Sequence, residues 1–332
     1  TFTPESLANF LADKLLHYCK HINDTFCVLD PACGNGALLA AMCKKKDVSS
    51  IIGYDTNESY LTVAKKLIAD ISRKNDSQFY NEDFLTVCPN NQDLFSNDIK
   101  REFADLIIAN PPYVRTQILG AEKAQQLAKD FKLTGRIDLY YPFFMAMTNA
   151  LKTGGLIGVI TSNRYICTKS GSDIRKYLLE NYHVLEVIDL GDTKLFDAAV
   201  LPAIFIGIKK NPSKKSEVKP KYTSIYETAP ADNAKVADSI FEVLNDDNSG
   251  VFNVNDTFFE LKKGILRQST DKSGIWQLDD NKDSSWISKI EANTSFRIKD
   301  KFKVRVGIKS CADNVFITQQ WIKEGFEIED DL

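Results

Sequence analysis

The sequence predicts an α/β fold with a doubly wound, mostly parallel sheet, and two observations support this prediction. Short apolar runs rich in Ile, Val and Leu alternate along residues 1–210 with helix-like stretches. Runs of this kind are typical of strands that helices cover on both faces. Because strands that alternate with helices usually form a parallel sheet, the pattern indicates a doubly wound architecture.

Seven apolar runs are predicted to be the strands of this sheet. They are Cys27–Asp30, Ile51–Asp55, Gln78–Asn81, Leu106–Ala109, Leu156–Thr161, Val184–Leu190 and Ala203–Lys209. The stretches between them are predicted helices: Ala37–Lys45, Glu58–Ser72, Leu139–Leu151 and Ser172–Glu180. Asp138 is a suitable N-cap for the third helix, and Gly154-Gly155 follows its end.

Length and composition bound the domain organisation. The chain has 332 residues, of which 43% are hydrophobic and 26% charged, as in ordinary globular proteins. That length accommodates one large domain and a smaller second unit. Lys, Pro and Ser become frequent around residues 209–221, so we assign residues 1–210 to the α/β domain and residues 211–332 to a linker and part of a second domain.

Cysteine spacing, hydropathy and charge exclude several classes of protein. The seven cysteines form no Cys-x-x-Cys pair, which predicts a reducing cytoplasm and neither a metal site nor a disulfide framework. No apolar run reaches the roughly 18–20 residues of a membrane span, and no signal peptide is visible. The ends at Thr1 and Leu332 indicate cuts in a longer protein. With a net charge of −3, any nucleic-acid-binding surface must be local.

The segment Asp30-Pro31-Ala32-Cys33-Gly34-Asn35-Gly36 joins the first strand to the first helix. Glycines at such a turn allow a ligand to approach the backbone closely. Asp55 ends the second strand, where its carboxylate can accept hydrogen bonds from a ribose diol. An NAD site would share this layout, but Leu39 replaces the third glycine of its motif, and Asp30 would oppose a pyrophosphate. A cofactor with a sulfonium cation and no phosphates fits Asp30 better.

A third acidic residue follows the third strand. Asp83 can accept a hydrogen bond from an adenine amino group, while Phe84 can lie against the ring. An Asp-Phe pair alone more often caps a helix. Here three acidic residues follow three successive strands, and ligands of open α/β sheets bind at that edge. The sequence therefore predicts an adenosine-containing cofactor.

The fourth strand ends in Asn110-Pro111-Pro112-Tyr113. These residues suit methylation of an exocyclic amino group, whose lone pair is delocalised into an aromatic ring. The Asn110 side-chain oxygen and the Pro111 carbonyl can each accept a hydrogen bond from one of the two N–H groups, which favours a tetrahedral nitrogen. The two prolines fix the backbone at this position. Tyr113 offers a stacking face for the base, worth about 1–3 kcal/mol. A proline-rich turn without function is the plainer alternative.

With these motifs, the chain resembles the gamma class of adenine-N6 DNA methyltransferases, particularly the fused restriction–modification enzymes. The resemblance covers Thr1 to about Lys210. It implies a class I, Rossmann-like methyltransferase fold, S-adenosylmethionine as cofactor and double-stranded DNA with a flipped adenine as substrate. It also implies that Thr3 closes over the cofactor, that Pro112 borders it, and that Phe196 is a second aromatic contact to the base. Whether a nuclease domain or subunit accompanies residues 1–332 is left open by the sequence.

By this resemblance, the expected cofactor-binding residues are Thr3, Asp30, Pro31, Ala32, Cys33, Gly34, Gly36, Asp55, Asp83, Phe84 and Pro112. The catalytic residues are Asn110, Pro111, Pro112 and Tyr113, and Phe196 stacks on the base with Tyr113. Two other classes of function remain open. Methyltransferases that act on protein glutamine or on RNA share the same or a similar tetrad, and a non-catalytic DNA-binding subunit could retain the fold.

The segment 297–306 alternates basic and mainly apolar residues, as a strand with one cationic face would. Its basic residues are Arg297, Lys299, Lys301, Lys303 and Arg305. They are candidates for contacts with the DNA backbone, with a solvated strand face as an equal alternative. Residues 307–316 resemble the start of the family's target-recognition domain, so residues 211–332 are expected to hold part of such a domain.

Overall fold

The computed structural model of the protein describes residues 2–19, 26–71, 76–88, 101–113, 120–131, 138–196, 201–213, 218–267, 274–279, 286, 289–290, 292–296 and 301. The chain divides into two units, Thr1–Asn281 and Lys282–Leu332. The helices and strands named below belong to the first unit.

The described residues form a 12-stranded sheet with the order β3-β2-β1-β4-β5-β7-β6-β8-β11-β10-β9, and β12 pairs with β11. The strands are β1 Cys27–Asp30, β2 Ser50–Tyr54, β3 Asp76–Tyr80, β4 Ala104–Ala109, β5 Leu151–Ser162, β6 Tyr182–Asp189, β7 Pro202–Lys209, β8 Lys221–Glu227, β9 Lys235–Val236, β10 Gly250–Val254, β11 Thr257–Arg267 and β12 Gln277–Asp279. Strands β3, β2, β1, β4 and β5 are parallel neighbours, and β7 is antiparallel to both β5 and β6. The predicted mostly parallel α/β sheet is confirmed, with β1–β7 as its seven predicted strands.

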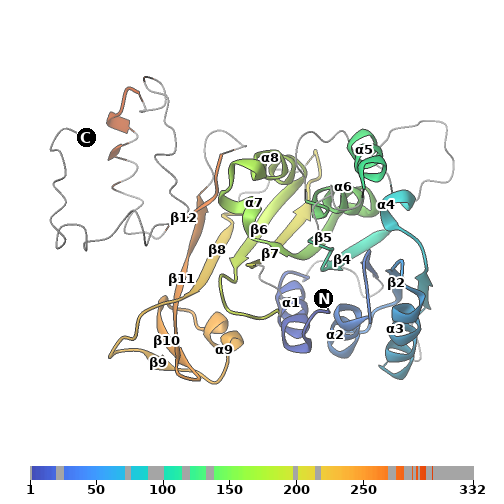
Figure 1. Cartoon of the computed structure of the whole chain (residues 1–332), viewed down its shortest axis with the longest axis horizontal. Helices are drawn as coiled ribbons and strands as arrows, with labels where there is room; N and C mark the ends of the chain where they lie inside the picture. The colour runs from blue at the N-terminus through green and yellow to red at the C-terminus, as the bar shows by residue number, and fades with distance from the viewer. Residues whose placement is uncertain are drawn as a thin grey trace, which may run out of the picture. The chain divides into compact units, whose positions relative to one another are not determined.

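Helices cover both faces of the sheet. They are α1 Glu5–Tyr18, α2 Ala37–Lys45, α3 Glu58–Ile71, α4 Phe84–Val87, α5 Ala121–Asp130, α6 Tyr140–Ala150, α7 Arg164–Cys167, the 3-10 helix η2 Lys169–Gly171, α8 Ser172–Asn181 and α9 Ile240–Asn245. Figure 1 shows α1, α2 and α3 on one face and α5, α6 and α8 on the other. Each face buries its own apolar cluster, one built with Leu11, Leu39 and Ile68 and the other with Phe144 and Leu178.

The third predicted helix begins differently from expectation. Its N-cap is Leu139, which makes no side-chain capping bond, and Asp138 uses its backbone carbonyl to accept from Tyr141 N at 3.0 Å. The predicted Asp138 N-cap is therefore wrong. The buried rings of Tyr140 and Tyr141 offer a physical reason, because packing of the first turn against the core outweighs a capping preference.

The sheet continues past residue 210. Strand β8 begins at Lys221 and pairs in parallel with β6, with Ser224 opposite Asp189. It also pairs antiparallel with β11 from Lys221 to Glu227. The 211–332 segment thus contributes strands to the sheet that carries the N-terminal half.

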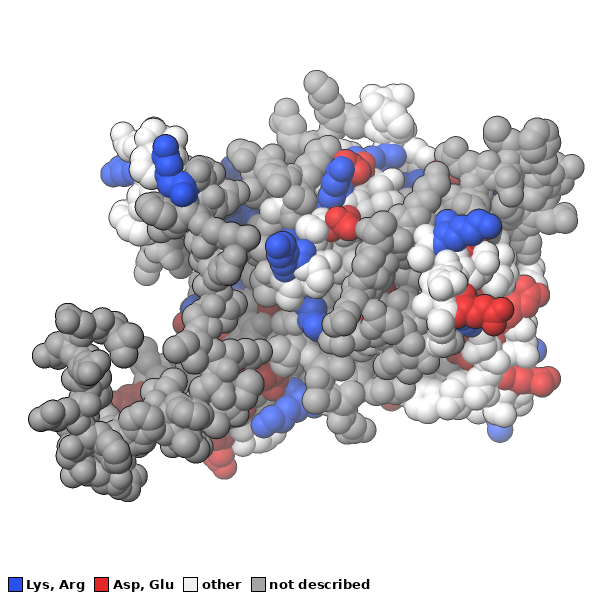
Figure 2. All heavy atoms as spheres, turned by 45° about the horizontal axis from the view of Figure 1, so that its top comes forward, with Lys and Arg blue, Asp and Glu red and all other residues white. Residues whose placement is uncertain are grey.

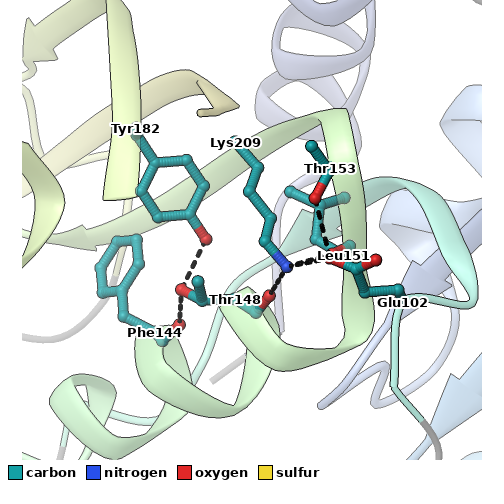
Figure 3. Close-up of polar contacts among 7 residues, drawn as sticks. All are labelled: Glu102, Phe144, Thr148, Leu151, Thr153, Tyr182 and Lys209. Carbon is teal, nitrogen blue, oxygen red and sulfur yellow. Dashed lines mark hydrogen bonds and ion pairs between the residues drawn. The ribbon is translucent and has the colours of Figure 1, made fainter. Parts of the chain in front are cut away.

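Lys209 joins the end of α6 to the sheet (Figure 3). Its ammonium donates to the carbonyl oxygens of Thr148 and Leu151, both at 2.7 Å, and pairs with Glu102 at 3.0 Å. A cation at a helix C-terminus stabilises carbonyls that lack intrahelical partners.

No described helix has the length and apolar character that a membrane crossing requires.

Candidate active site

The β1–α2 turn folds tightly beneath the carboxyl edge of the sheet. Asp30 is 1% exposed, and its Oδ1 accepts from Ala32 N at 3.1 Å. Gly34 and Gly36 both have positive φ, +51° and +83°. A Cβ at Gly36 would lie 2.9 Å from the Ala64 Cβ, so helix α3 packs where only glycine fits. The predicted glycine turn therefore packs closely against α3, and its Gly34 lines the cavity described below.

Asp55 links this turn to the end of β2. Its Oδ2 accepts from Gly34 N at 2.9 Å, and its Oδ1 accepts from Asn57 N at 2.8 Å. The carboxylate therefore stands between the two strand ends where the sequence predicts a ribose. Each oxygen has a further lone pair for a hydroxyl donor.

Asp83 has two partners in the structure. It is the N-cap of α4, where its Oδ1 accepts from Leu85 N at 3.2 Å, and its Oδ2 pairs with Lys123 Nζ at 3.1 Å. Phe84 is buried and lies against Tyr54, with ring centroids 5.2 Å apart. Asp83 therefore caps α4, and both Asp83 and Phe84 line the cavity described below.

Asn110 follows β4 directly, and its side chain has a partner at each end. Its Nδ2 donates to Thr3 Oγ1 at 2.9 Å, while its Oδ1 accepts from the Tyr113 hydroxyl. Thr3 precedes α1, so the N-terminal segment and the strand end meet at this amide. Burial raises the pKa of the Tyr113 hydroxyl, which therefore stays protonated and able to donate.

Tyr113 and Phe196 form an aromatic pair. Their ring centroids are 6.4 Å apart and the planes meet at 86°, so the edge of one ring points at the face of the other. Phe196 is 8% exposed and lies in the segment that joins β6 to β7. The structure thus brings together both aromatic residues that the sequence assigns to a substrate base.

A single cavity of about 580 Å³ unites these residues, within the range of small-molecule sites. The predicted residues that line it are Pro31, Ala32, Gly34, Asp55, Asp83, Phe84, Asn110, Pro111, Pro112, Tyr113 and Phe196. The predicted residues absent from its lining are Thr3, Asp30, Cys33 and Gly36. Thr3, Asp30 and Cys33 each adjoin a residue that lines the cavity, and Gly36 lies two positions after Gly34, which also lines it.

Further lining residues were not predicted from the sequence. They are Phe2, Thr56, Tyr60, Glu82, Leu85, Lys123, Leu139 and Phe143. Phe2, Thr56, Glu82 and Leu85 each adjoin a predicted residue, so extending each motif by one position would have found them. Lys123 and Phe143 come from α5 and α6, and no local pattern connects those helices to the strand ends.

The environment of Asp30 is unfavourable to a carboxylate. Burial, reinforced by the nearby charge of Asp55, raises its pKa to about 8 despite the hydrogen bond from Ala32 N. Asp30 is therefore protonated at neutral pH in this state. It holds the turn below the cavity, and any effect on a bound cation would act through the turn at longer range.

The predicted basic strand lies largely outside the described residues: Arg297, Lys299, Lys303 and Arg305 are not described, and Lys301 is exposed. Among the residues that the structure does describe, Figure 2 shows Lys and Arg side chains interspersed with Asp and Glu on the face in view. Described residues also contain no group of His, Cys, Asp and Glu placed to hold a metal ion.

Comparison with known proteins places this site in a family. Residues 35–196 match the Eco57I restriction-modification methylase family, and this range contains every cavity-lining residue from Asp55 to Phe196. The type II methyltransferase M.BanIII of Aneurinibacillus aneurinilyticus is 40% identical over 100% of this chain and 60% of its own length. The chain thus spans 60% of that curated relative's length.

Two solved structures share the fold. A Listeria monocytogenes protein described as a class I S-adenosylmethionine-dependent methyltransferase superposes with a TM-score of 0.53 at 21% identity, over 67% of this chain and 65% of that protein. The type IIG restriction endonuclease BpuSI superposes with a TM-score of 0.57 at 18% identity, over 98% of this chain and 39% of that protein. At these identities the likeness concerns the fold alone, which is that of class I methyltransferases.

Proposed function

The chain belongs to the Eco57I restriction-modification methylase family, and from this premise we propose that it is an S-adenosylmethionine-dependent DNA methyltransferase that methylates N6 of a flipped adenine. One observation carries the proposal. The tetrad Asn110 to Tyr113 lines the same cavity as Asp55 and Asp83, which supports a proposed amino-group site next to a proposed adenosine site.

The residues present fit S-adenosylmethionine. Asp55 would accept from its ribose, Asp83 from its adenine amino group, and Phe84 would pack against its adenine ring. Pro31, Ala32 and Gly34 line the cavity, and so does Pro112, which the proposal places beside the cofactor. When bound, this cofactor supplies an electrophilic methyl group on a sulfonium.

Asn110 and Pro111 would hold the substrate nitrogen. Asn110 Oδ1 and the Pro111 carbonyl each accept a hydrogen bond from one of its two N–H groups. These bonds draw the nitrogen towards a tetrahedral geometry, so its lone pair is no longer delocalised into the ring. These acceptors are fixed beforehand by the end of β4 and the two prolines, so little reorganisation is needed as positive charge develops on the nitrogen. The methylated, cationic nitrogen then releases one proton to water, because the amide oxygen of Asn110 and the carbonyl of Pro111 are too weakly basic to keep it.

Tyr113 has two states in this proposal. In the structure, its hydroxyl donates to Asn110 Oδ1, the same oxygen that must accept from the substrate. The arriving amino group replaces that hydroxyl as the donor, and the Tyr113 ring becomes a stacking face for the base. Base–aromatic stacking of about 1–3 kcal/mol offsets much of the few kcal/mol that extrusion of the base costs.

Restriction–modification supplies the biological setting of the proposal: double-stranded DNA as partner and the cytoplasm as compartment. The edge of the cavity at Tyr113 and Phe196 suits any planar amino-bearing group, so protein glutamine and RNA bases are the competing substrates. The proposal favours DNA adenine because the family is one of restriction-modification methylases.

Transfer of a labelled methyl group tests the substrate class. The whole chain is incubated with labelled cofactor and, in parallel, unmethylated bacterial DNA, cellular RNA and a protein extract. We expect label in DNA, recovered as N6-methyldeoxyadenosine after nucleoside digestion. Label in protein or RNA with none in DNA would replace this function with one of the competing assignments. Tight DNA binding without any transfer would indicate a non-catalytic subunit.

A further inference from the structure

The segment that carries Phe196 is held from both sides. It leaves the sheet at Asp189, the last residue of β6, and returns at Pro202, the first residue of β7. Leu190 N donates to Pro202 O at 2.9 Å, and Asn163 N donates to Leu201 O at 2.8 Å. The two ends of the segment are therefore tied together beside Asn163.

The Asp189 carboxylate accepts hydrogen bonds from three residues in different parts of the chain. Its Oδ1 accepts from Asn163 Nδ2 at 3.0 Å and from Gly191 N at 3.1 Å. Its Oδ2 accepts from the Tyr226 hydroxyl at 2.7 Å, and Asn163 Nδ2 also donates to that hydroxyl at 3.1 Å. Asp189 and Asn163 are 6% and 8% exposed, so these bonds are shielded from water.

Strand β8 makes further contacts with the same segment. Glu227 N donates to Asp192 Oδ1 at 2.7 Å. Gly191 has φ +51°, and a Cβ there would lie 2.1 Å from Ile225 O, so only glycine lets the segment pass this close to β8. The Thr193 hydroxyl donates to Leu190 O at 2.7 Å and closes the turn that leads to Phe196.

From these contacts we propose that Tyr226 of β8 is a positioning residue for the aromatic pair Tyr113–Phe196. It acts through Asp189 and the turn at Gly191, and it does not line the cavity itself. The inference rests on the proposed function, since positioning matters for turnover only if a substrate base stacks on this pair. Asp192 supports the same segment by accepting from the β8 backbone.

The proposal extends the catalytic unit beyond residue 210. Strand β8 pairs along its whole length, Lys221 to Glu227, with β11, which in turn pairs with β12. Through these pairings, the strands that follow the methyltransferase motifs in sequence shape the pocket for the base. Residues after 210 are then part of the machinery that positions the substrate, not only a route to a recognition domain.

Tyr226→Phe tests the proposal, with Tyr182→Phe as the matched control. The control also removes one buried tyrosine hydroxyl, which lies 2.7 Å from Thr148 Oγ1 (Figure 3), at the end of β6 opposite Asp189. Backbone hydrogen exchange over residues 190–196 is measured in both variants, together with cofactor affinity, kcat and KM on DNA. We expect Tyr226→Phe to speed exchange there and lower kcat roughly 5- to 10-fold, the factor for one ordinary hydrogen bond, with cofactor affinity unchanged.

Each outcome decides one claim. Unchanged exchange over residues 190–196 in Tyr226→Phe, or an equal change in Tyr182→Phe, would overturn the positioning role. Absence of DNA methylation by the unaltered protein would reject the proposed function, while the exchange data would still decide whether Tyr226 anchors the segment. A second pair checks the same path: Asp192→Asn keeps an acceptor for Glu227 N and should preserve exchange rates, whereas Asp192→Ala should raise them.

Discussion

At the residue scale, the side chain of Asn110 depends on contacts from both directions along the chain. Thr3 Oγ1 accepts from its Nδ2 across 107 positions of sequence, and Tyr113 donates to its Oδ1. A preorganised acceptor requires such support, because an unsupported amide would lose rotational freedom at the moment of reaction. Thr3 was predicted to close over the cofactor, which stays a prediction; in the structure its hydroxyl oxygen contacts Asn110.

Asp55→Ala should weaken binding of S-adenosylmethionine by roughly 1.5–3 kcal/mol, the range for hydrogen bonds to a charged group. Calorimetric titration measures the loss. Asp76→Ala is the control. Asp76 is exposed and is the first residue of β3, so it lies at the opposite edge of the sheet from Asp55, and its Oδ2 accepts from Gln78 Nε2 at 3.0 Å. Equal affinities for wild type and Asp55→Ala would remove Asp55 from the cofactor site.

Asp30→Asn should change how stability depends on pH. The folded-state pKa of Asp30 is raised from 3.8 to about 8, so between these pH values the folded protein binds a proton that the unfolded chain has released. Asp30 therefore lowers the free energy of unfolding as pH rises through this window, by up to about 1.4 kcal/mol per pH unit. The asparagine variant lacks this contribution.

Denaturant unfolding of both proteins at pH 5, 6, 7 and 8 checks the sign. The wild-type minus Asp30→Asn difference in unfolding free energy should decrease steadily towards pH 8, within the window set by the two pKa values. A difference that is constant over the range, or that grows with pH, would show that Asp30 is ionised in the folded protein.

Sequence patterns predict the residues of this site where chemistry and strand ends coincide. Asp55, Asp83 and Asn110 each follow a strand of the parallel part of the sheet, so their position at one edge could be inferred from the sequence. Lys123 could not be inferred, because its contact with Asp83 joins residues 40 positions apart through the packing of α5. Tyr226 could not be predicted from the sequence for the same reason, since its partner Asp189 lies on a strand that neighbours β8 only in the folded sheet.

At the element scale, strands β1–β7 and helices α2, α3, α6 and α8 were predicted from the sequence, whereas α1, α5 and β8 were not. The predicted helix Ala37–Lys45 has the same bounds as α2, and Glu58–Ser72 ends one residue after α3. In contrast, α5 has only Leu127 buried, so its sequence carries a weak apolar signal. Strand β8 mixes buried, half-buried and exposed positions and directly follows the stretch 209–221, which is rich in Lys, Pro and Ser, so it was not predicted as a strand.

Lys209→Met should lower the free energy of unfolding by about 2 kcal/mol, within the range for hydrogen bonds from a charged group. The variant keeps the apolar stem but leaves the Thr148 and Leu151 carbonyls without their shared donor (Figure 3). The Lys209 side chain is 15% exposed, so water replaces the ammonium poorly. Chemical denaturation measures the change.

Lys262→Met is the control for this prediction. Lys262 pairs with Glu260 at 3.0 Å, but both side chains are largely exposed, and such pairs contribute about 0–1 kcal/mol. A loss in Lys209→Met no greater than that in Lys262→Met would contradict the anchoring role of Lys209 at the end of α6.

At the scale of the whole molecule, one sheet carries both the predicted catalytic motifs and the strands that follow them. The family match ends at residue 196, while the 40% identical relative aligns over all of this chain, so the region beyond the shared core is common to at least these two proteins. The basic residues of segment 297–306 stay a prediction for the DNA backbone. The assignment of residues 211–332 to part of a recognition domain also stays a prediction.

The most direct test of the account compares wild type with Asn110→Ala by mass spectrometry of N6-methylated adenine in unmethylated bacterial DNA incubated with S-adenosylmethionine. Cofactor affinity is measured on the same preparations, since Asn110 is assigned to the substrate nitrogen. The account predicts that wild type forms the methylated base, and that Asn110→Ala forms it on the order of 10²–10³ more slowly with nearly unchanged cofactor affinity. Wild-type turnover by Asn110→Ala on any DNA would contradict the amino-methylation mechanism.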